Sequence, residues 1–368
     1  MTTREAYIAL NMMEKIGPVG VQALQQALGS VEAVFEADRA ALMRADGIGR
    51  ETAETIVEAR ARLDWRGEME RAEQEGVRLT TPVDPDYPEA LKQIYDPPLA
   101  LYVRGSIQSR DRQALAIVGT RHPTHYGREC ARRFACQLSK AGYTVVSGLA
   151  DGVDTCAHEG ALEAKGRTWA VLGGALDCLY PTSNRELARR IEGQGAVFSE
   201  FPFGRRPDRT TFPMRNRIVS GMTMGTIVIE AGLKSGALIT ARQALEQGRL
   251  VMAVPGRIDS PASRGTHDLI KQGAKLVESV DDVLAEFEFL FPPSVMARQA
   301  TRPVQPDLSD QETLLLAALD AGADDTDALI RAMKTDVGTL SALLIGLEMK
   351  RMVKMLPGRR VERVGEWQ

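Results

Sequence analysis

Residues 114–148 read ALAIVGTRHPTHYGRECARRFACQLSKAGYTVVSG. Two short apolar runs, 114–119 and 143–148, enclose an amphipathic stretch of helical length, and this alternation continues to about residue 288. The later apolar runs are RTWAVLG, GAVFSE, GTIVIEA, RLVMAVPG and AKLVES. Most of these runs are continuously apolar, as strands covered on both faces are. The sequence therefore predicts an α/β fold with a mostly parallel sheet covered by helices.

A helical pattern precedes this region. Residues 1–75 carry apolar residues three and four apart, and Gly47-Ile48-Gly49 lies between two of the predicted helices. This all-α segment resembles a helix-hairpin-helix or SAM-like domain. Its glycine turn would either present backbone amides to a phosphate or form a plain helical hairpin with a glycine cap.

The other boundaries follow from changes in composition. Residues 291–308 hold several prolines and few large apolar residues, so we expect a linker there and an α/β core over 76–290. Residues 309–368 predict three helices and a β-hairpin that turns at Pro357-Gly358. Three helices and a hairpin are typical of a winged-helix domain.

The charge is nearly balanced over the chain as a whole. The net charge of the 368 residues is −3, so any basic surface for nucleic acid must be local. Residues 204–217, GRRPDRTTFPMRNR, form such a patch, with five arginines and one aspartate.

Composition also argues against a membrane span and a metal site. No apolar run approaches the roughly 18 to 20 residues of a span, and MTTREAYIAL has no basic region followed by an apolar one. We therefore expect a cytoplasmic protein without a membrane span. The four cysteines form no C-x-x-C pair, and the four histidines are too scattered for an H-E-x-x-H helix.

Small and polar residues follow nearly every predicted strand. The carboxyl ends of parallel strands meet at one edge of a sheet, where ligands of such folds bind. The strand ends carry Gly119-Thr120-Arg121, Ser147-Gly148, Gly173-Gly174, Ser199-Glu200 and Gly232 to Gly236. Glycine allows a ligand to approach the backbone, and the following helix N-termini favour anions, so we expect a phosphate or phosphodiester here.

Cationic side chains surround the same predicted edge. The candidates are Arg121, Arg215, Arg217, Lys234 and Arg257, with hydroxyls from Ser147, Ser235 and Thr240. Arginine matches phosphate oxygens with two parallel hydrogen bonds. Each arginine could instead be a solvated surface charge or part of an internal ion pair, as Arg217 with Glu230.

Known phosphate-loop motifs are missing. The first strand is followed by GTRHPTHYG in place of G-x-G-x-x-G, and no G-x-x-x-x-G-K-[ST] occurs. We therefore expect neither a dinucleotide cofactor nor ATP hydrolysis, and no cofactor is expected at all.

Candidate catalytic groups are few. Asp154 and His158 are four residues apart and could share a helix face for acid–base chemistry. The preferred interpretation is structural, with Asp154 capping a helix and His158 packing or pairing with it. Glu200 and Glu230 have no evident partner nucleophile, so we expect a protein that is not an enzyme.

Six motifs occur in order between about residues 80 and 290. They are IVGTRHPTHYG, VSGLADGVDTCAHEGAL, AVLGGALDCLYPTSN, FPMRNRIVSG, EAGLKSGALITARQALEQGR and AVPGRIDSPASRGTHDLIKQGA. Together they resemble the DprA (Smf) family, the DNA processing proteins of natural transformation. The resemblance implies a Rossmann-like core that binds single-stranded DNA, protects incoming strands and loads RecA, in a protein that acts as a dimer and has no established catalytic residues.

The resemblance and the strand ends together nominate a set of DNA-binding residues. They are Gly119, Thr120, Arg121, Ser147, Gly148, Gly174, Phe212, Arg215, Asn216, Arg217, Lys234, Ser235, Gly236 and Thr240. Between the two arginines of FPMRNR, we expect Arg215 to grip phosphate and Arg217 to be held by Glu200 or Glu230. Candidate platforms for bases are Phe203, Phe212, Tyr126 and Tyr180, of which Phe212 is preferred because arginines flank it on both sides.

Two departures from the family pattern affect these expectations. Ala237 stands where many members have a serine, which removes one hydroxyl. The third helix of the tail, DVGTLSALLIGLEMK, is nearly neutral, whereas a helix that reads a DNA groove usually carries more basic residues.

Two other functions remain as alternatives. The core also resembles the LOG phosphoribohydrolases, which cleave a base from a nucleoside monophosphate, but VPGRIDSPASRG lacks the glutamate of their P-G-G-x-G-T-x-x-E motif. A transcription regulator would bind duplex DNA through the tail, which the near-neutral helix disfavours.

Overall fold

The computed structural model of the chain describes residues 1–287, 308–350, 352–356 and 360–363. The chain divides into two compact units, Met1–Pro292 and Pro293–Gln368. Nearly all of the expected linker at 291–308, and the expected turn at Pro357-Gly358, lie outside the described residues. None of the helices in the described ranges is both long and apolar enough to cross a bilayer.

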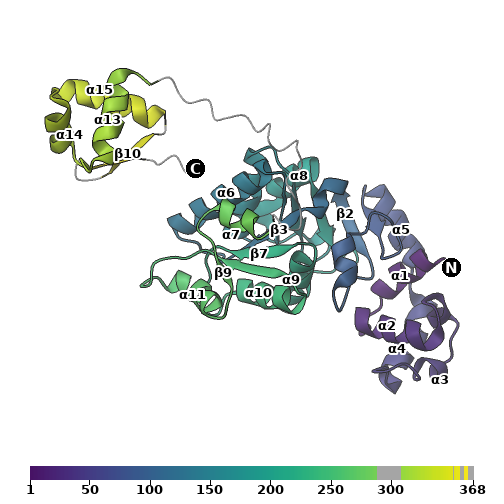
Figure 1. Ribbon diagram of the computed structural model, residues 1–368. Coiled ribbons are helices and arrows are strands. Elements are labelled where there is room, and N and C mark those ends of the chain that lie inside the picture. Colours follow the sequence, from purple (N-terminus) through teal and green to yellow (C-terminus); the bar gives the residue numbers. More distant parts are fainter. Residues whose placement is uncertain (288–307, 351, 357–359, 364–368) are drawn as a thin grey trace. The chain divides into compact units, whose positions relative to one another are not determined.

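The first unit is built on a nine-stranded sheet (Figure 1). Its strands are β1 (Arg78–Thr80), β2 (Leu101–Gly105), β3 (Ala114–Val118), β4 (Thr144–Ser147), β5 (Thr168–Val171), β6 (Ala196–Ser199), β7 (Gly225–Val228), β8 (Leu250–Ala253) and β9 (Lys275–Leu276). The order is β1-β2-β6-β5-β4-β3-β7-β8-β9. The β1–β2 and β2–β6 pairs are antiparallel and the remaining pairs are parallel, which confirms the predicted mostly parallel sheet.

Helices cover both faces of this sheet (Figure 1). They are α6 (His125–Lys140), α7 (Val153–Glu163), α8 (Arg185–Gln194), α9 (Thr211–Gly221), α10 (Gly236–Glu246), α11 (Arg264–Lys271) and α12 (Val280–Ala285). Alternation along β3 separates the two layers: Leu115 and Ile117 pack with α6 and α7, whereas Ala116 and Val118 pack with α9 and α10. Because both faces are covered, every residue of β3 is buried.

The segment before the sheet is helical, as expected. Its helices are α1 (Thr3–Asn11), α2 (Pro18–Leu28), α3 (Arg39–Leu42), α4 (Arg50–Arg62) and α5 (Trp65–Gln74). Short 3₁₀ turns complete the unit at η1 (Glu32–Phe35), η2 (Glu89–Gln93), η3 (Ser109–Arg112), η4 (Leu176–Cys178), η5 (Thr182–Asn184) and η6 (Pro261–Ser263). The predicted glycine turn leads from α3 into α4: Gly47 has a φ of +74° and Gly49 is the N-cap of α4.

The second unit has a small core of its own. It comprises α13 (Asp310–Asp320), α14 (Thr326–Met333), α15 (Val337–Met349), β10 (Val353–Leu356) and β11 (Arg360–Arg363). The two strands pair antiparallel, and Leu315, Leu329, Leu344 and Val361 pack among the buried residues between the elements. The predicted arrangement of three helices and a hairpin is therefore present.

Candidate nucleic-acid interface

A cavity of about 590 Å³ opens at the carboxyl edge of the sheet. Strands β3 and β7 are neighbours there, while the chain continues from β3 to β4 on the other side. At such a topological switch point the connecting loops part in opposite directions and leave a crevice. The cavity is lined by the loops that follow β3, β4 and β7, by the start of α7, by one side of α9 and by the first turn of α10.

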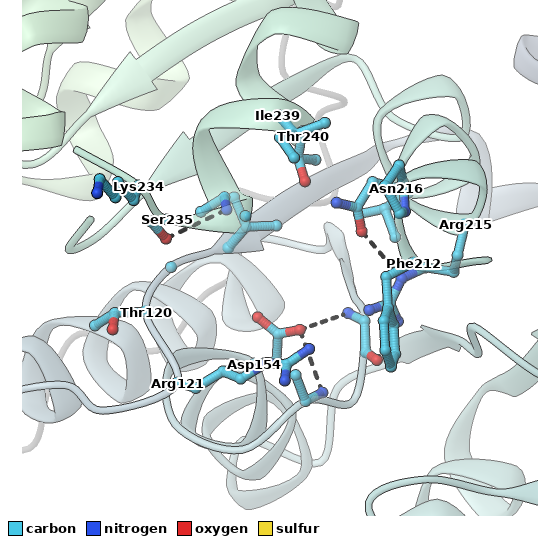
Figure 2. A pocket seen from close by; sticks show the side chains of 18 of the residues that line it. Thr120, Arg121, Asp154, Phe212, Arg215, Asn216, Lys234, Ser235, Ile239 and Thr240 are labelled. Carbon is cyan, nitrogen blue, oxygen red and sulfur yellow. Dashed lines mark hydrogen bonds between the residues drawn. The ribbon is translucent and has the colours of Figure 1, made fainter. Parts of the chain in front are cut away.

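Most of the residues nominated from the sequence line this cavity. They are Gly119, Thr120, Arg121, Gly148, Phe212, Arg215, Asn216, Lys234, Ser235, Gly236 and Thr240. Figure 2 shows Lys234 and Ser235 on one side of the cavity and Phe212, Arg215 and Asn216 on the other. Folding thus brings together residues from four separate segments of the chain.

Three exposed cations stand around the cavity. Arg121, Arg209 and Lys234 line it, and within the described part of the chain no ion pair engages any of them. The guanidinium carbon of Arg121 lies 5.1 Å from the centroid of the Phe212 ring. Helix α10 also begins at the cavity, with Ser235 as its N-cap, so the positive end of the helix dipole adds to these charges. This arrangement favours an anion.

Arg215 forms part of the floor of the cavity. Its side chain is buried, and one guanidinium nitrogen donates to the carbonyl oxygens of both Gly148 and Val171. Burial lowers the pKa of Arg215 to about 10, with the charge of Asp154 acting in the opposite sense, so the side chain is charged at neutral pH. We expected Arg215 to grip phosphate. In the structure its guanidinium instead holds the segments at Gly148 and Val171 from below the cavity.

The floor of the cavity is tightly packed where Gly148 meets Arg215. A Cβ atom at this position would overlap the guanidinium of Arg215. The amides of Gly148 and Ala150 donate to the carboxylate of Asp154, at 3.1 Å and 3.3 Å. Asp154 and Arg215 together hold this loop from two sides, and any residue larger than glycine at 148 would displace Arg215.

Arg217, which was nominated as a DNA contact, does not line the cavity. It is 5% exposed, and its guanidinium pairs with Glu200 at 2.6 Å and with Asp96 at 3.0 Å. The predicted pairing with Glu200 is confirmed, whereas Glu230 instead accepts hydrogen bonds from the backbone amide and the hydroxyl of Thr124. Arg217 follows Arg215 by two positions and so lies on a different side of α9.

Two more nominated residues do not line the cavity. Ser147 is fully buried at the end of β4, and its hydroxyl donates to the carbonyl oxygen of Ile117 at 2.6 Å. Gly174 packs against Pro207, and its carbonyl oxygen accepts from Ser199 at 2.8 Å. The structure thus does not bring these two nominated residues to the cavity, because the hydroxyl of Ser147 and the backbone of Gly174 are engaged within the protein.

The candidate platforms occupy different environments. Phe212 lines the cavity, packs against Gly173 and lies 6.3 Å from Tyr180 between ring centroids. Phe203 is partly buried: it packs edge-on against Tyr102, and the guanidinium of Arg71 covers its ring. Tyr126 lines a second cavity, described below.

Asp154 and His158 do not form the acid–base pair considered from the sequence. Gly152, not Asp154, is the N-cap of α7, and Asp154 instead binds the loop after β4. His158 is fully buried and its Nδ1 lies 2.7 Å from the hydroxyl of Thr168. The prediction that His158 packs in the interior is confirmed, and the predicted cap is wrong.

Several residues of the cavity were not nominated from the sequence, and three of them bear on its chemistry. Arg209, Pro213 and Ile239 line it. Arg209 belongs to the arginine-rich patch at 204–217, so composition gave a signal for it. Nothing in the sequence singles out Ile239, an exposed apolar residue on α10.

Comparison with known proteins identifies relatives of all three segments. Residues 78–288 match the model of a family described as DNA recombination-mediator protein A. Residues 299–359 match a DprA winged helix domain and residues 7–62 a SAM-like helix-hairpin-helix tandem, which confirms the two flanking folds predicted from the sequence. The chain is 34% identical to Protein Smf of Synechocystis over 98% of this chain and 99% of that protein. It is 42% identical to DNA processing protein DprA of Bacillus subtilis over 58% of this chain and 72% of the relative.

Solved structures agree with this assignment. The X-ray structure of DNA processing protein A from Streptococcus pneumoniae matches with a TM-score of 0.69 and 34% identity, over 78% of this chain and 99% of that one. A structure of DNA processing protein A from Helicobacter pylori matches with a TM-score of 0.53 and 31% identity, over 58% and 97%. That structure is described as giving insight into a single-stranded DNA binding mode of the Helicobacter pylori protein.

Proposed function

Because the chain belongs to the family of DNA recombination-mediator protein A, also called DprA or Smf, we propose that it binds single-stranded DNA and delivers it to RecA. In this role it protects incoming strands from nucleases during natural transformation and acts as a homodimer. The observation that carries the DNA-binding part is the glycine-lined cavity at the β3/β7 switch point with its three exposed cations.

The chemistry of this cavity suits a single strand. Arg121, Arg209 and Lys234 supply positive charge without competing ion pairs among the described residues, and glycines let the phosphodiester backbone come close. Phe212 offers an aromatic face beside Arg121 for a base. A duplex keeps its bases paired and stacked, so it could not use such a platform.

The first test compares single-stranded and duplex oligonucleotides of one sequence in a binding assay at several salt concentrations. We expect tighter binding of the single strand and a steep loss of affinity as salt rises. Replacing Arg121, Arg209 and Lys234 together with glutamine should abolish most of the binding. Arg189→Gln is the control, because Arg189 is exposed on α8 and pairs with Glu186 outside the cavity. Equal affinity of the triple variant and the unchanged protein would contradict the proposed site.

The second test addresses RecA. RecA filament assembly is followed on single strands first covered by the protein, and nuclease digestion of the same strands is timed with and without it. We expect faster assembly and slower digestion. Unchanged or slower assembly would argue against delivery to RecA, and release of free base from AMP would point to a phosphoribohydrolase.

A further inference from the structure

A second cavity of about 610 Å³ lies at the same carboxyl edge of the sheet. It is formed where α6 begins, where β7 ends and where the chain leaves β8, and its walls include Tyr126, Glu230, Pro255 and Arg257. Of the residues considered from the sequence, the candidate base platform Tyr126 and the candidate cation Arg257 line it, together with Glu230.

The two cavities share the same two loops. In the loop after β3, His122 lines the first cavity and Thr124 lines the second. Two residues of chain span at most about 7 Å, so the cavities adjoin. In the loop after β7, Glu230 lines the second cavity and Gly232 lines the first.

Hydrogen bonds hold these loops against each other. The backbone carbonyl of Glu230 accepts from the amide of Thr120 at 2.7 Å. Its carboxylate accepts from the amide and the hydroxyl of Thr124, at 2.9 Å and 2.6 Å. Gly127 is required for this contact, because a Cβ atom there would overlap the carboxylate. The relative position of the two cavities is therefore fixed by the fold.

The second cavity has a different chemistry from the first. Its wall contains the Glu230 carboxylate, which is 3% exposed, and the Thr124 amide at the start of α6 already donates to that carboxylate. Arg257, at the same cavity, is paired with Asp259 at 2.9 Å. The negative charge of Glu230 disfavours a phosphate beside it, whereas the exocyclic amino group of a base could donate to the carbonyl and carboxylate oxygens.

Tyr126 provides an aromatic surface in this cavity. The residue is 48% exposed, and its hydroxyl donates to the carbonyl oxygen of Pro255 at 2.9 Å. This hydrogen bond ties α6 to the loop after β8 and fixes the orientation of the ring. A fixed, half-exposed aromatic ring is a suitable surface for stacking of a nucleobase.

We propose that the second cavity binds the base of a nucleotide in the same strand whose phosphate occupies the first cavity, with the base stacked on Tyr126. This proposal rests on the proposed single-strand binding function. The strand then passes over the loop from Thr120 to Tyr126, and its footprint covers both cavities.

The test combines a protein variant with a modified ligand. Affinities for single-stranded oligonucleotides of increasing length are measured for the unchanged protein, Tyr126→Ala and Tyr126→Leu. We expect about a tenfold loss with Tyr126→Ala on strands long enough to reach both cavities, in line with the strength of base stacking on aromatic residues. Mononucleotides should bind all three proteins equally. Tyr95→Ala is the matched control, because Tyr95 is 77% exposed and lines neither cavity.

An abasic scan gives a readout in the unchanged protein that does not depend on the folding of a variant. One abasic position in a longer strand should weaken binding by about tenfold, and Tyr126→Ala should add no further loss on that strand. If single strands bind but Tyr126→Ala matches the unchanged protein at every length, and no abasic position is coupled to Tyr126, the second cavity does not hold a base. If the unchanged protein binds no single strand, the proposed function fails as well.

Discussion

Arg215 and Arg217 are both buried, yet the protein balances their charges in different ways. Arg217 lies between two carboxylates, those of Glu200 and Asp96. Arg215 donates to two backbone carbonyl oxygens below the cavity, and the Asp154 carboxylate adds an opposite charge. Two arginines of the basic patch are therefore structural. The charge available to a ligand comes from Arg209 of the same patch and from Arg121 in the loop after β3.

Arg217→Ala tests this structural role. The substitution leaves the buried Glu200 carboxylate without its partner, and breaking a buried ion pair in this way costs about 3 to 5 kcal/mol. The free energy of unfolding of the first unit, measured in urea, should fall by that amount. Arg189→Ala, at an exposed pair, should change it by less than about 0.5 kcal/mol. An equally small change for Arg217→Ala would show that the pair does not stabilise the fold.

Arg121 and Lys234 are expected to contact phosphates, and salt dependence can count such contacts. For single strands, each neutralised phosphate contributes about 0.7 to the slope of log affinity against log salt concentration. Arg121→Gln and Lys234→Gln should each reduce the magnitude of the slope by about 0.7. Arg189→Gln should leave it unchanged. A lower affinity with an unchanged slope would mean that the residue acts through packing, which for Arg121 would be its contact with Phe212.

Among elements, the central strands are the part that sequence predicts best. Strands β3 to β8 are covered on both faces, so their residues must be apolar at consecutive positions, and the pattern shows this directly. Strand β1 has only three residues, too few to show a period, and it was not predicted. In the predicted run at 274–279 only Lys275 and Leu276 pair with β8, and both are exposed.

Side-chain directions at the strand ends were harder to predict. The carboxyl ends of parallel strands lie at one edge of the sheet, so the residues that follow them can be placed at that edge from the sequence. Thr120, Gly148 and Ser235 do line the cavity there. Ser147 precedes Gly148 by one position, yet its hydroxyl is directed into the sheet. Which of two neighbours is buried depends on the phase of the strand and on the helices packed against it. The burial of Arg217 likewise depends on carboxylates that are distant in sequence.

Helix α7 holds a buried histidine whose protonation is linked to stability. The hydroxyl of Thr168 donates to the carbonyl of Val145, so Nδ1 of His158 donates to that hydroxyl, and Nε2 is buried without a partner. Burial, and next the charge of Arg215, lower the pKa of His158 from 6.5 to about 3. The ring is therefore neutral in the folded state at neutral pH.

This shift predicts a pH dependence of unfolding. Below pH 6.5 the unfolded chain takes up a proton on His158 that the folded chain does not bind until about pH 3. The free energy of unfolding should therefore fall as the pH falls through this window, by at most about 1.4 kcal/mol per pH unit from this residue. His158→Leu should flatten the dependence. A ring titration of His158 near pH 6.5 in the folded protein, observed by NMR, would contradict the prediction.

At the scale of the whole molecule, the two units have separate interiors. Within the described residues, each cluster of buried apolar side chains belongs wholly to one unit. Both cavities are lined by residues of the first unit. Helix α15 of the second unit contains a single charged residue, Glu348, so it lacks the basic side chains that contact phosphates when a helix enters the major groove.

The separate interiors predict that single-strand binding does not require the second unit. A shortened chain that ends at Phe287 keeps every residue that lines the two cavities. Its affinity for a single-stranded oligonucleotide, and the salt slope of that affinity, should match those of the longer chain within about twofold, because phosphate contacts set both quantities. The same oligonucleotide as a duplex is the matched control. If shortening removes the single-strand affinity, or if the second unit alone binds the duplex as tightly as the longer chain, the winged helix and not the cavity dominates DNA binding.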